Sequence, residues 1–188
     1  ALPKIFGSPN NISHSAICAE AEKFGPYYTE GYWGYRQYDV TRARYIILWG
    51  ADPLAANRQV SHYSAAWGDA VDSATIAIAE PRLSGNAAKA DEWLPVKRGT
   101  DGALAVAIAH VLLTEGLWHK DFVGDFTDGE NRFVAGQYVD TDMFEEKHTN
   151  GLVTWWNLEL KDKRPEWAAN ITDVPVDQIK RVAVGYGQ

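Results

Sequence analysis

The chain has 188 residues, a length that suits one domain with a buried core. Its net charge of −7 argues against nucleic-acid binding. The sequence has no run of about 18 apolar residues, so we expect no direct membrane insertion. The single cysteine, Cys18, excludes an internal disulfide and a cysteine-only metal cluster, but leaves one candidate metal ligand or nucleophile. No signal peptide is visible, and the opening Ala-Leu-Pro suggests a piece of a longer chain.

The first elements precede any α/β pattern. Residues 1–12 contain several helix breakers and are predicted to form a loop. Residues 14–24 predict a helix, with Ser13 as its N-cap and Gly25–Pro26 as its end. Residues 27–38 are crowded with Tyr and Trp, most of which we expect simply to pack, with one or two offering a hydroxyl to a buried polar site.

An α/β pattern then begins. Short apolar runs predict buried strands at residues 44–50 and 75–79, with a helix at residues 53–71 between them. Residues 92–96 predict a short third strand, which Pro95 confines to an edge or a strand end. Residues 101–115 form the clearest helical pattern, which begins at Thr100 or Asp101 and ends at Gly116. This order predicts a βαβ core with a mostly parallel sheet.

The rest of the chain is less regular. Residues 117–164 are acidic and aromatic and are predicted to be an irregular excursion, whereas residues 165–169 and 176–184 predict two closing helices. We therefore expect a single domain over residues 1–188. Its segments are an active-site helix with the aromatic stretch (1–43), the βαβ core (44–116), the excursion (117–164) and the closing helices (165–188).

Polar residues follow each predicted strand, where open parallel sheets bind ligands. Three carboxylates, Asp52, Glu80 and Asp101, lie at these ends and suit the N1–H and amino group of guanine. Arg82, Ser84 and the amides near Thr100 are candidates for holding phosphate. No G-x-G-x-x-G or P-loop motif is present. Helix capping alone remains an alternative role for the carboxylates.

The first predicted helix is a second candidate site. His14, Ser15 and Cys18 are three and four residues apart and share a helix face, and Lys23 lies just over a turn further on. A cysteine near a helix N-terminus and beside cations favours its thiolate form, which suits a soft metal with an oxyanion nearby. The alternative is that Cys18 is a small buried apolar side chain.

These features occur in an order that resembles the dimethyl sulfoxide reductase family of molybdenum oxidoreductases. The similar segments are residues 7–10 (GSPN) before the cysteine helix, 45–53 (YIILWGADP), 80–84 (EPRLS), 87–101 (AAKADEWLPVKRGTD) and 165–183 (PEWAANITDVPVDQIKRVA). The resemblance implies a Rossmann-like, doubly wound, mostly parallel sheet with flanking helices. It also implies that the chain is the central molybdopterin-guanine-dinucleotide-binding domain of a larger subunit, whose missing N-terminal part carries an iron–sulfur cluster.

The implied cofactor-binding residues lie at the ends of the predicted strands. The sequence departs from the usual family motifs in three places: Asp52 stands for Asn, Glu80 for Asp, and Arg98 for Pro. Glu80 is one methylene longer than the residue it replaces. The full set is Gly50, Asp52, Pro53, Asn57, Glu80, Arg82, Ser84, Gly99, Thr100 and Asp101.

Residues 13–28 (SHSAICAEAEKFGPYY) and 35–39 (YRQYD) resemble one branch of this family, the respiratory arsenate reductases. This resemblance implies Cys18 as the molybdenum ligand, with His14, Ser15, Lys23 and Tyr35 around an arsenic oxyanion. It implies two-electron oxygen-atom transfer from arsenate to give arsenite in the full periplasmic enzyme. The remainder of the catalytic subunit and an iron–sulfur electron-transfer subunit would be its partners, and the isolated chain would be inactive.

Several alternatives stay open. An arsenite oxidase of the same family would run the reaction in reverse, and a thiosulfate, tetrathionate or polysulfide reductase would share the cysteine helix. Tungsten could replace molybdenum. From a different class, the chain could be a nucleotide-binding module without redox activity, which binding of NAD rather than GDP would reveal.

Overall fold

The computed structural model describes residues 2–10 and 20–188. It separates into two compact units, Ala1–Asp39 and Val40–Gln188, which we call the N-terminal and C-terminal units. None of the helices in the described ranges is long and apolar enough to cross a bilayer.

The described residues of the N-terminal unit form the helices α1 (Leu2–Ile5) and α2 (Glu20–Glu30). Two predictions are wrong here, because α1 lies within the expected loop and α2 continues through Gly25–Pro26. The helix ends instead at Gly31, which has a φ of 68° and whose N–H donates to the Tyr27 carbonyl at 3.0 Å. The predicted residues 14–19 lie outside the described residues.

Aromatic packing explains why α2 passes its internal proline. Pro26 removes one helical hydrogen bond. Phe24 stacks on Tyr28 one turn later, with 6.1 Å between ring centroids, and its ring meets Trp33 edge-on at 5.0 Å. Tyr27 also contacts Trp33, at 5.7 Å. These contacts hold the two turns around Pro26 against one segment, so tertiary packing overrides the local breaker.

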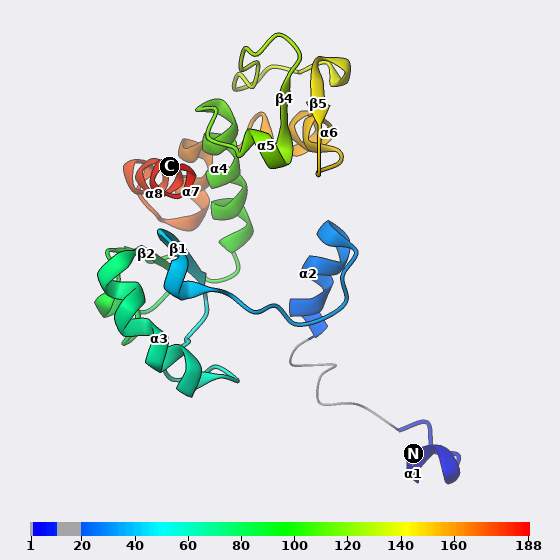
Figure 1. The fold of residues 1–188 in the computed structure, drawn as a ribbon, viewed down its shortest axis with the longest axis vertical. Coiled ribbons are helices and arrows are strands. Elements are labelled where there is room, and N and C mark those ends of the chain that lie inside the picture. The colour runs from blue at the N-terminus through cyan, green and yellow to red at the C-terminus, as the bar shows by residue number, and fades with distance from the viewer. Residues whose placement is uncertain (1, 11–19) are drawn as a thin grey trace. The chain divides into compact units, whose positions relative to one another are not determined.

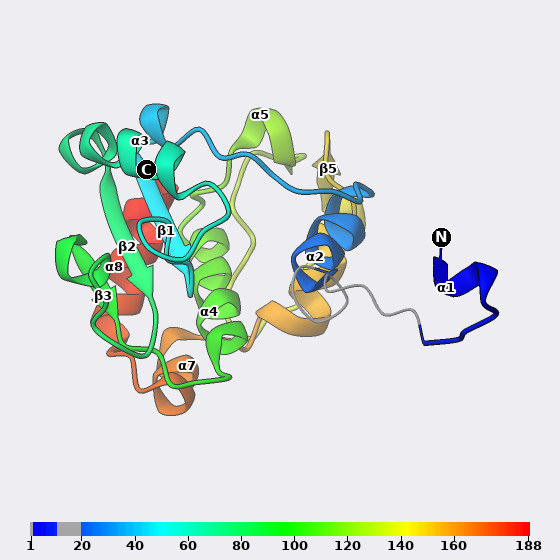
Figure 2. The same cartoon turned by 90° about the horizontal axis from the view of Figure 1, so that it is seen from below.

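Three parallel strands form the centre of the C-terminal unit. They are β1 (Tyr45–Trp49), β2 (Thr75–Ala79) and β3 (Glu92–Leu94), in the order β1-β2-β3. Figure 2 shows them side by side, with β2 in the middle. Tyr45 pairs with Thr75 and Ala77 pairs with Glu92, so the three strands end along one edge of the sheet.

The side chains of β2 alternate between two apolar clusters. Ile76 and Ile78 pack with α3 (Val60–Ser73), whereas Ala77 and Ala79 pack with α4 (Asp101–Thr114) and the closing helices. The closing helices are α7 (Pro165–Thr172) and α8 (Val176–Gly187). Figure 1 shows helices on both sides of the sheet. The predicted α/β class, with a parallel sheet and flanking helices, is therefore confirmed.

One boundary in this core is wrong. Helix α3 begins at Val60, although Pro53 was expected near its start. Asn57 directs a local turn instead, because its Oδ1 accepts the Gln59 N–H at 2.9 Å. Residues 51–59 therefore form a turn-rich connection between β1 and α3. Two short 3-10 helices, Val40–Arg42 and Ala87–Lys89, also belong to this unit.

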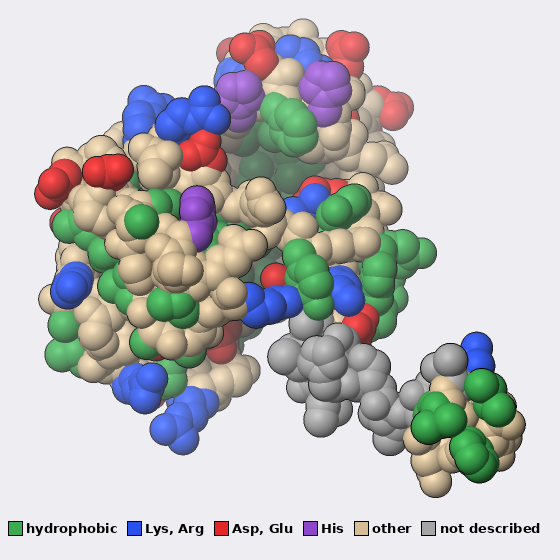
Figure 3. Space-filling view, turned by 60° about the horizontal axis from the view of Figure 1, so that its bottom comes forward, with side chains coloured by type: hydrophobic (Ala, Val, Ile, Leu, Met, Phe, Trp, Pro, Cys, Tyr) green, Lys and Arg blue, Asp and Glu red, His purple; other side chains and the backbone are tan. Residues whose placement is uncertain are grey.

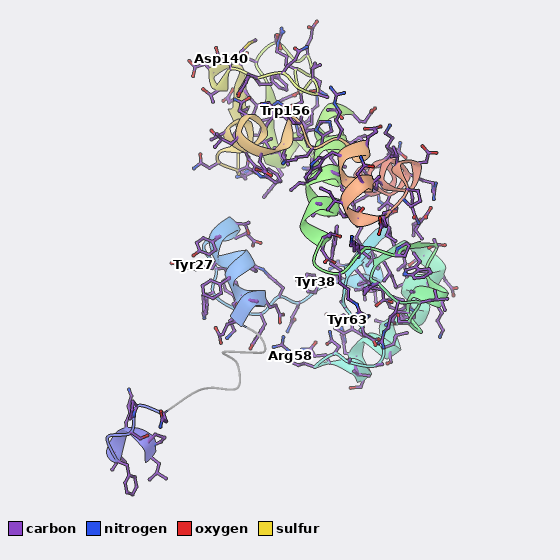
Figure 4. All side chains as sticks on the ribbon, turned by 180° about the vertical axis from the view of Figure 1, so that it is seen from behind. Tyr27, Tyr38, Arg58, Tyr63, Asp140 and Trp156 are labelled. Atoms are coloured by element: carbon purple, nitrogen blue, oxygen red, sulfur yellow. The ribbon has the colours of Figure 1, made fainter. Side chains whose placement is uncertain are left out.

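Residues 117–164, predicted as an irregular excursion, contain short elements around an apolar cluster of their own. Strands β4 (Gly124–Phe126) and β5 (Phe144–Glu146) pair antiparallel. Figure 4 labels Trp156 and Asp140 within this segment, with Asp140 towards the top of the view. The helical pieces are α5 (Lys120–Val123), the 3-10 helix Thr141–Met143, α6 (Leu152–Trp155) and the π-helix Trp156–Leu160.

Helix α4 joins this cluster to the sheet. Leu104 and Ala107 face the sheet and the closing helices, whereas Leu113 packs with Phe133 and Trp156 of the second cluster. A helix that is apolar on all sides is stable in water only when both faces are covered. The run of apolar residues in α4 therefore reflects its position between two cores.

His110 of α4 is buried where this helix packs against Trp156 and Leu160 of the second cluster. Its Nδ1 is 2.7 Å from the Leu160 carbonyl oxygen, so the ring donates from Nδ1, and it stacks on Trp156 at 5.3 Å. Burial lowers the pKa of His110, and this effect outweighs the opposing one of the Leu160 carbonyl.

We expect this histidine to make the fold less stable in mild acid. Because the folded-state pKa is lower than that of the unfolded chain, the unfolded state binds the additional proton. Stability is complete above the unfolded value of about 6.5 and falls as the pH drops through the lower folded-state value. His110→Gln keeps a donor for Leu160 without titrating. Thermal unfolding between about pH 7.5 and 5 should therefore depend less on pH in this variant. An unchanged pH dependence would show that His110 is not responsible.

Candidate functional site

In the N-terminal unit, Lys23 and Tyr35 come together on α2 and the aromatic segment that follows it. The Lys23 ammonium lies 4.8 Å from the centre of the Tyr35 ring and 5.7 Å from that of Trp33. It also donates to Glu20 Oε1 at 3.2 Å. This hydrogen bond is the largest of the effects that raise the pKa of Lys23, so the side chain is a cation at neutral pH.

The other predicted residues of this site, His14, Ser15 and Cys18, lie outside the described residues. Within residues 2–10 and 20–188, no group of three or more His, Cys, Asp and Glu side chains could hold a metal ion. The structure therefore brings together two of the five predicted residues. It adds Glu20 and Trp33, which the pattern of His, Ser, Cys and Lys did not indicate.

At the carboxyl edge of the sheet, the turn after β1 begins at Gly50. Its φ of 56° is favourable only for residues such as glycine, and its N–H donates to the Ala79 carbonyl at 2.9 Å. This turn leads to Asp52 and the buried Pro53. Asp52 Oδ1 accepts a hydrogen bond from Nδ2 of Asn86, which follows β2. The ends of the first two strands are thus joined through side chains.

Glu80 directly follows β2 and is buried, with an exposed fraction of 7%. It accepts a hydrogen bond from the Ser84 hydroxyl, whose oxygen in turn accepts the Ala87 N–H at 3.2 Å. Among the described residues Glu80 has no ion-pair partner. Buried carboxylates are usually paired with donors, so Glu80 has capacity for a further donor from a ligand.

Three cations, Arg82, Lys97 and Arg98, follow the ends of β2 and β3 and are exposed. None of them forms an ion pair within the part of the chain that the structure describes, although many other Lys and Arg side chains do. In Figure 3 the Lys and Arg side chains of the C-terminal unit lie in several separate groups. Unpaired cations beside a ligand-binding edge suit phosphate groups.

The start of α4 adds donors to the same edge. Gly99 has a φ of 77°, and the Thr100 N–H donates to the Lys97 carbonyl at 3.1 Å. The Thr100 hydroxyl also donates to that carbonyl, at 2.6 Å, and does not cap the helix. The first amides of α4, at Asp101 and Gly102, therefore have no side-chain cap and can receive an anion.

The contacts of two residues differ from what the strand-end pattern indicated. Asn57 is exposed, and its side chain serves the local turn to Gln59 rather than a contact with the strand ends. Asn86 was missed, although it is buried and contacts Asp52. The sequence offered one weak signal, because Asn86 is a polar residue directly before the family-like segment 87–101.

The opposite, amino edge of the sheet has a pocket of about 650 Å³. Its charged groups largely satisfy one another. Arg181 pairs with Glu92 at 2.5 Å and lowers the pKa of that carboxyl, and Asp91 accepts the Ile76 N–H at 2.8 Å. The carboxyl edge keeps unpaired charges and is therefore the better candidate. The pocket is lined by Arg44, Tyr45, Thr75, Asp91, Glu92, Arg181, Gly185, Tyr186 and Gln188.

Known proteins share this sequence and fold. The chain is 55% identical to the arsenate respiratory reductase molybdopterin-containing subunit ArrA of Shewanella sp. (strain ANA-3), over 99% of this chain and 22% of that protein. It is 54% identical to ArrA of Chrysiogenes arsenatis, over 100% of this chain and 22% of that protein. The thiosulfate reductase subunit PhsA of Salmonella typhimurium (strain LT2) is 28% identical over 96% and 20%.

The chain thus spans about a fifth of the length of these relatives. Among solved structures, acetylene hydratase from Pelobacter acetylenicus matches with a TM-score of 0.70 at 22% identity, over 96% of this chain and 21% of that one. That likeness supports the fold alone, since one fold can serve different reactions. A sequence model described as molybdopterin oxidoreductase matches residues 4–183. The chain therefore belongs to the molybdopterin oxidoreductase family.

Proposed function

We propose that the chain is the part of a respiratory arsenate reductase catalytic subunit that binds molybdopterin guanine dinucleotide and carries part of the arsenate pocket. The observation that carries this proposal is the 55% identity to ArrA over nearly the whole chain. Because the chain spans 22% of that relative, catalysis belongs to the longer parent protein. The remainder of the subunit would complete the site.

The carboxyl edge of the sheet would hold the nucleotide end of the cofactor. Its carboxylate acceptors, the buried Glu80 and the partly exposed Asp52, suit the N–H groups of guanine, because each accepts one hydrogen bond from a neighbouring side chain and retains further lone pairs. Arg82, Lys97 and Arg98 would neutralise the phosphates, together with the uncapped start of α4. These acceptors and cations together fit a guanine nucleotide.

The N-terminal unit would bind the oxyanion. Lys23 is held as a cation by Glu20 and lies against the Tyr35 ring, so an ammonium and a phenol ring lie together in this unit. His14 and Ser15 would complete it, and Cys18 would ligate the metal. Bound cofactor supplies the two-electron oxygen-atom transfer chemistry. Lys23 would stabilise negative charge as it develops on the departing oxygen.

The partners follow from the same proposal. The electrons would come from an iron–sulfur cluster in the N-terminal part of the parent and from an iron–sulfur partner subunit, in the periplasm during anaerobic respiration. Molybdenum is the proposed metal, with tungsten as the alternative that metal analysis of the purified parent would identify.

The test is oxidation of a reduced viologen dye by the full-length parent, with arsenate, tetrathionate and thiosulfate offered separately. We expect oxidation with arsenate and little with either sulfur compound. Rapid turnover of thiosulfate or tetrathionate alone would retain the family but overturn the arsenic assignment. The 28% identity to PhsA makes this the relevant second candidate. Arsenite with an oxidised dye tests the reverse direction.

A further inference from the structure

Asn86 is a buried polar residue at the carboxyl edge that the nucleotide-binding proposal does not use. Its exposed fraction is 2%, and its Nδ2 donates to Asp52 Oδ1. Its own Oδ1 is buried without a hydrogen-bond partner among the described residues. The assignment of the two amide atoms is unambiguous, because a carboxylate oxygen needs a donor.

Keeping a buried amide with one unmet atom is unfavourable for folding. An apolar side chain of similar size would fill the same space without that cost. The Asn86 side chain therefore contributes something that an apolar residue cannot, and the one polar contact that this side chain makes within the described residues is with Asp52. This contact joins the end of β1 to the loop after β2, 34 positions later in the chain.

The consequence for Asp52 is that its carboxylate has one defined orientation. Oδ1 is occupied by Asn86, and Oδ2 accepts no hydrogen bond from the residues that the structure describes. Asp52 is itself partly exposed, whereas Asn86 is buried behind it. The Asn86 amide thus fixes the Asp52 carboxylate at the carboxyl edge of the sheet and leaves Oδ2 as an acceptor for a ligand.

We propose that Asn86 is a positioning residue for nucleobase recognition, and that it orients Asp52 to accept an N–H of guanine. The inference rests on the proposed function. Guanine offers an N1–H and an adjacent amino group to such an acceptor, whereas adenine has an acceptor at N1. Asn86 therefore contributes to selectivity for guanine over adenine, and not to phosphate binding.

The experiment uses full-length parent protein produced without its cofactor and titrated with GDP and with ADP by calorimetry. We expect the unsubstituted protein to prefer GDP. Asn86→Ala should weaken GDP binding about tenfold and leave ADP binding unchanged, because a charge-assisted hydrogen bond that orients the acceptor is lost. Asn86→Ser retains a donor and should restore most of the preference.

Asn131→Ala is a control at an exposed position, because the Asn131 side chain also makes hydrogen bonds, to the Leu113 and Thr114 carbonyls at 2.8 and 3.1 Å. It should affect stability without changing the ratio of GDP to ADP affinity. If the unsubstituted protein prefers GDP and Asn86→Ala has the same preference, the positioning role is wrong and the proposed function stands. If the unsubstituted protein shows no preference for GDP, both are overturned.

Discussion

Lys23→Gln in the full-length parent should lower kcat/KM for arsenate by about 100-fold, the usual effect of removing one preorganised donor from a developing oxyanion. Glutamine keeps a polar side chain of similar length but removes the charge that Glu20 stabilises. We expect most of the loss in kcat, because the proposed contact strengthens as charge moves to the departing oxygen. Steady-state viologen oxidation over a range of arsenate concentrations separates kcat from KM.

Arg36→Gln is the control for this substitution. Arg36 lies in the same unit, stacks over Tyr32 at 4.6 Å and pairs with Glu30, so its removal changes charge and aromatic packing in a comparable way. Its effect on kcat/KM should be less than about threefold, as for an exposed ion pair. A Lys23→Gln enzyme that behaves like Arg36→Gln would exclude Lys23 from the oxyanion site. Lys23→Arg should retain more activity than Lys23→Gln.

The central βαβ core could be predicted from the sequence because its signals are local. Residues 75–79 alternate Ile and Ala between two clusters, and the predicted strand matches β2 over its whole length. Helix α4 ends within one residue of its prediction, since Gly116 adopts a φ of 70° just after it. Such elements form wherever short-range pattern and tertiary packing agree.

The wrong helix boundaries arise where the short-range sequence pattern and the tertiary packing disagree. Pro26 is a strong local breaker, but Phe24, Tyr28 and Trp33 pack across it. Pro53 is a common first residue of a helix, but the turn at Asn57 delays α3 by seven residues. Neither contact has a periodic signature in the sequence. Propensity alone therefore predicts a helix end at Pro26 and a helix start at Pro53, which the structure does not have.

The apolar cluster of residues 117–164 could not be predicted from the sequence, for a different reason. Its strands β4 and β5 have three residues each, and its aromatic residues are spread over residues 126–156. A three-residue strand is too short to show alternation.

In the candidate site, too, some features could be predicted from the sequence and others could not. The placement of Asp52 and Glu80 at the ends of strands could be predicted from topology, and their role in binding a ligand stays a prediction. Asn86 could not, because its importance comes from burial and from a contact with a residue 34 positions away. Its role remains a proposal, as do those of the residues around the proposed metal ligand.

Trp156→Ala should remove most of the stability of residues 117–164. Trp156 is fully buried, and its ring lies 5.0 Å from that of Phe133 and 5.3 Å from that of His110. Its indole N–H donates to the Gln137 carbonyl at 2.9 Å. Truncating a buried tryptophan costs about 3–5 kcal/mol, since a cavity replaces the ring and a buried carbonyl loses its donor. We expect hydrogen exchange in β4 and β5 to accelerate accordingly.

Trp155→Ala provides a control at the neighbouring position, where the side chain is 45% exposed. It should change the same exchange rates by much less, because little apolar area is lost from a core. Exchange in β1 and β2 should be nearly unchanged in both variants, since these strands pack with the other two clusters. If Trp156→Ala also accelerated exchange throughout β1 and β2, the two parts of the C-terminal unit would unfold together. Helix α4, which packs against both, would then be the element that couples them.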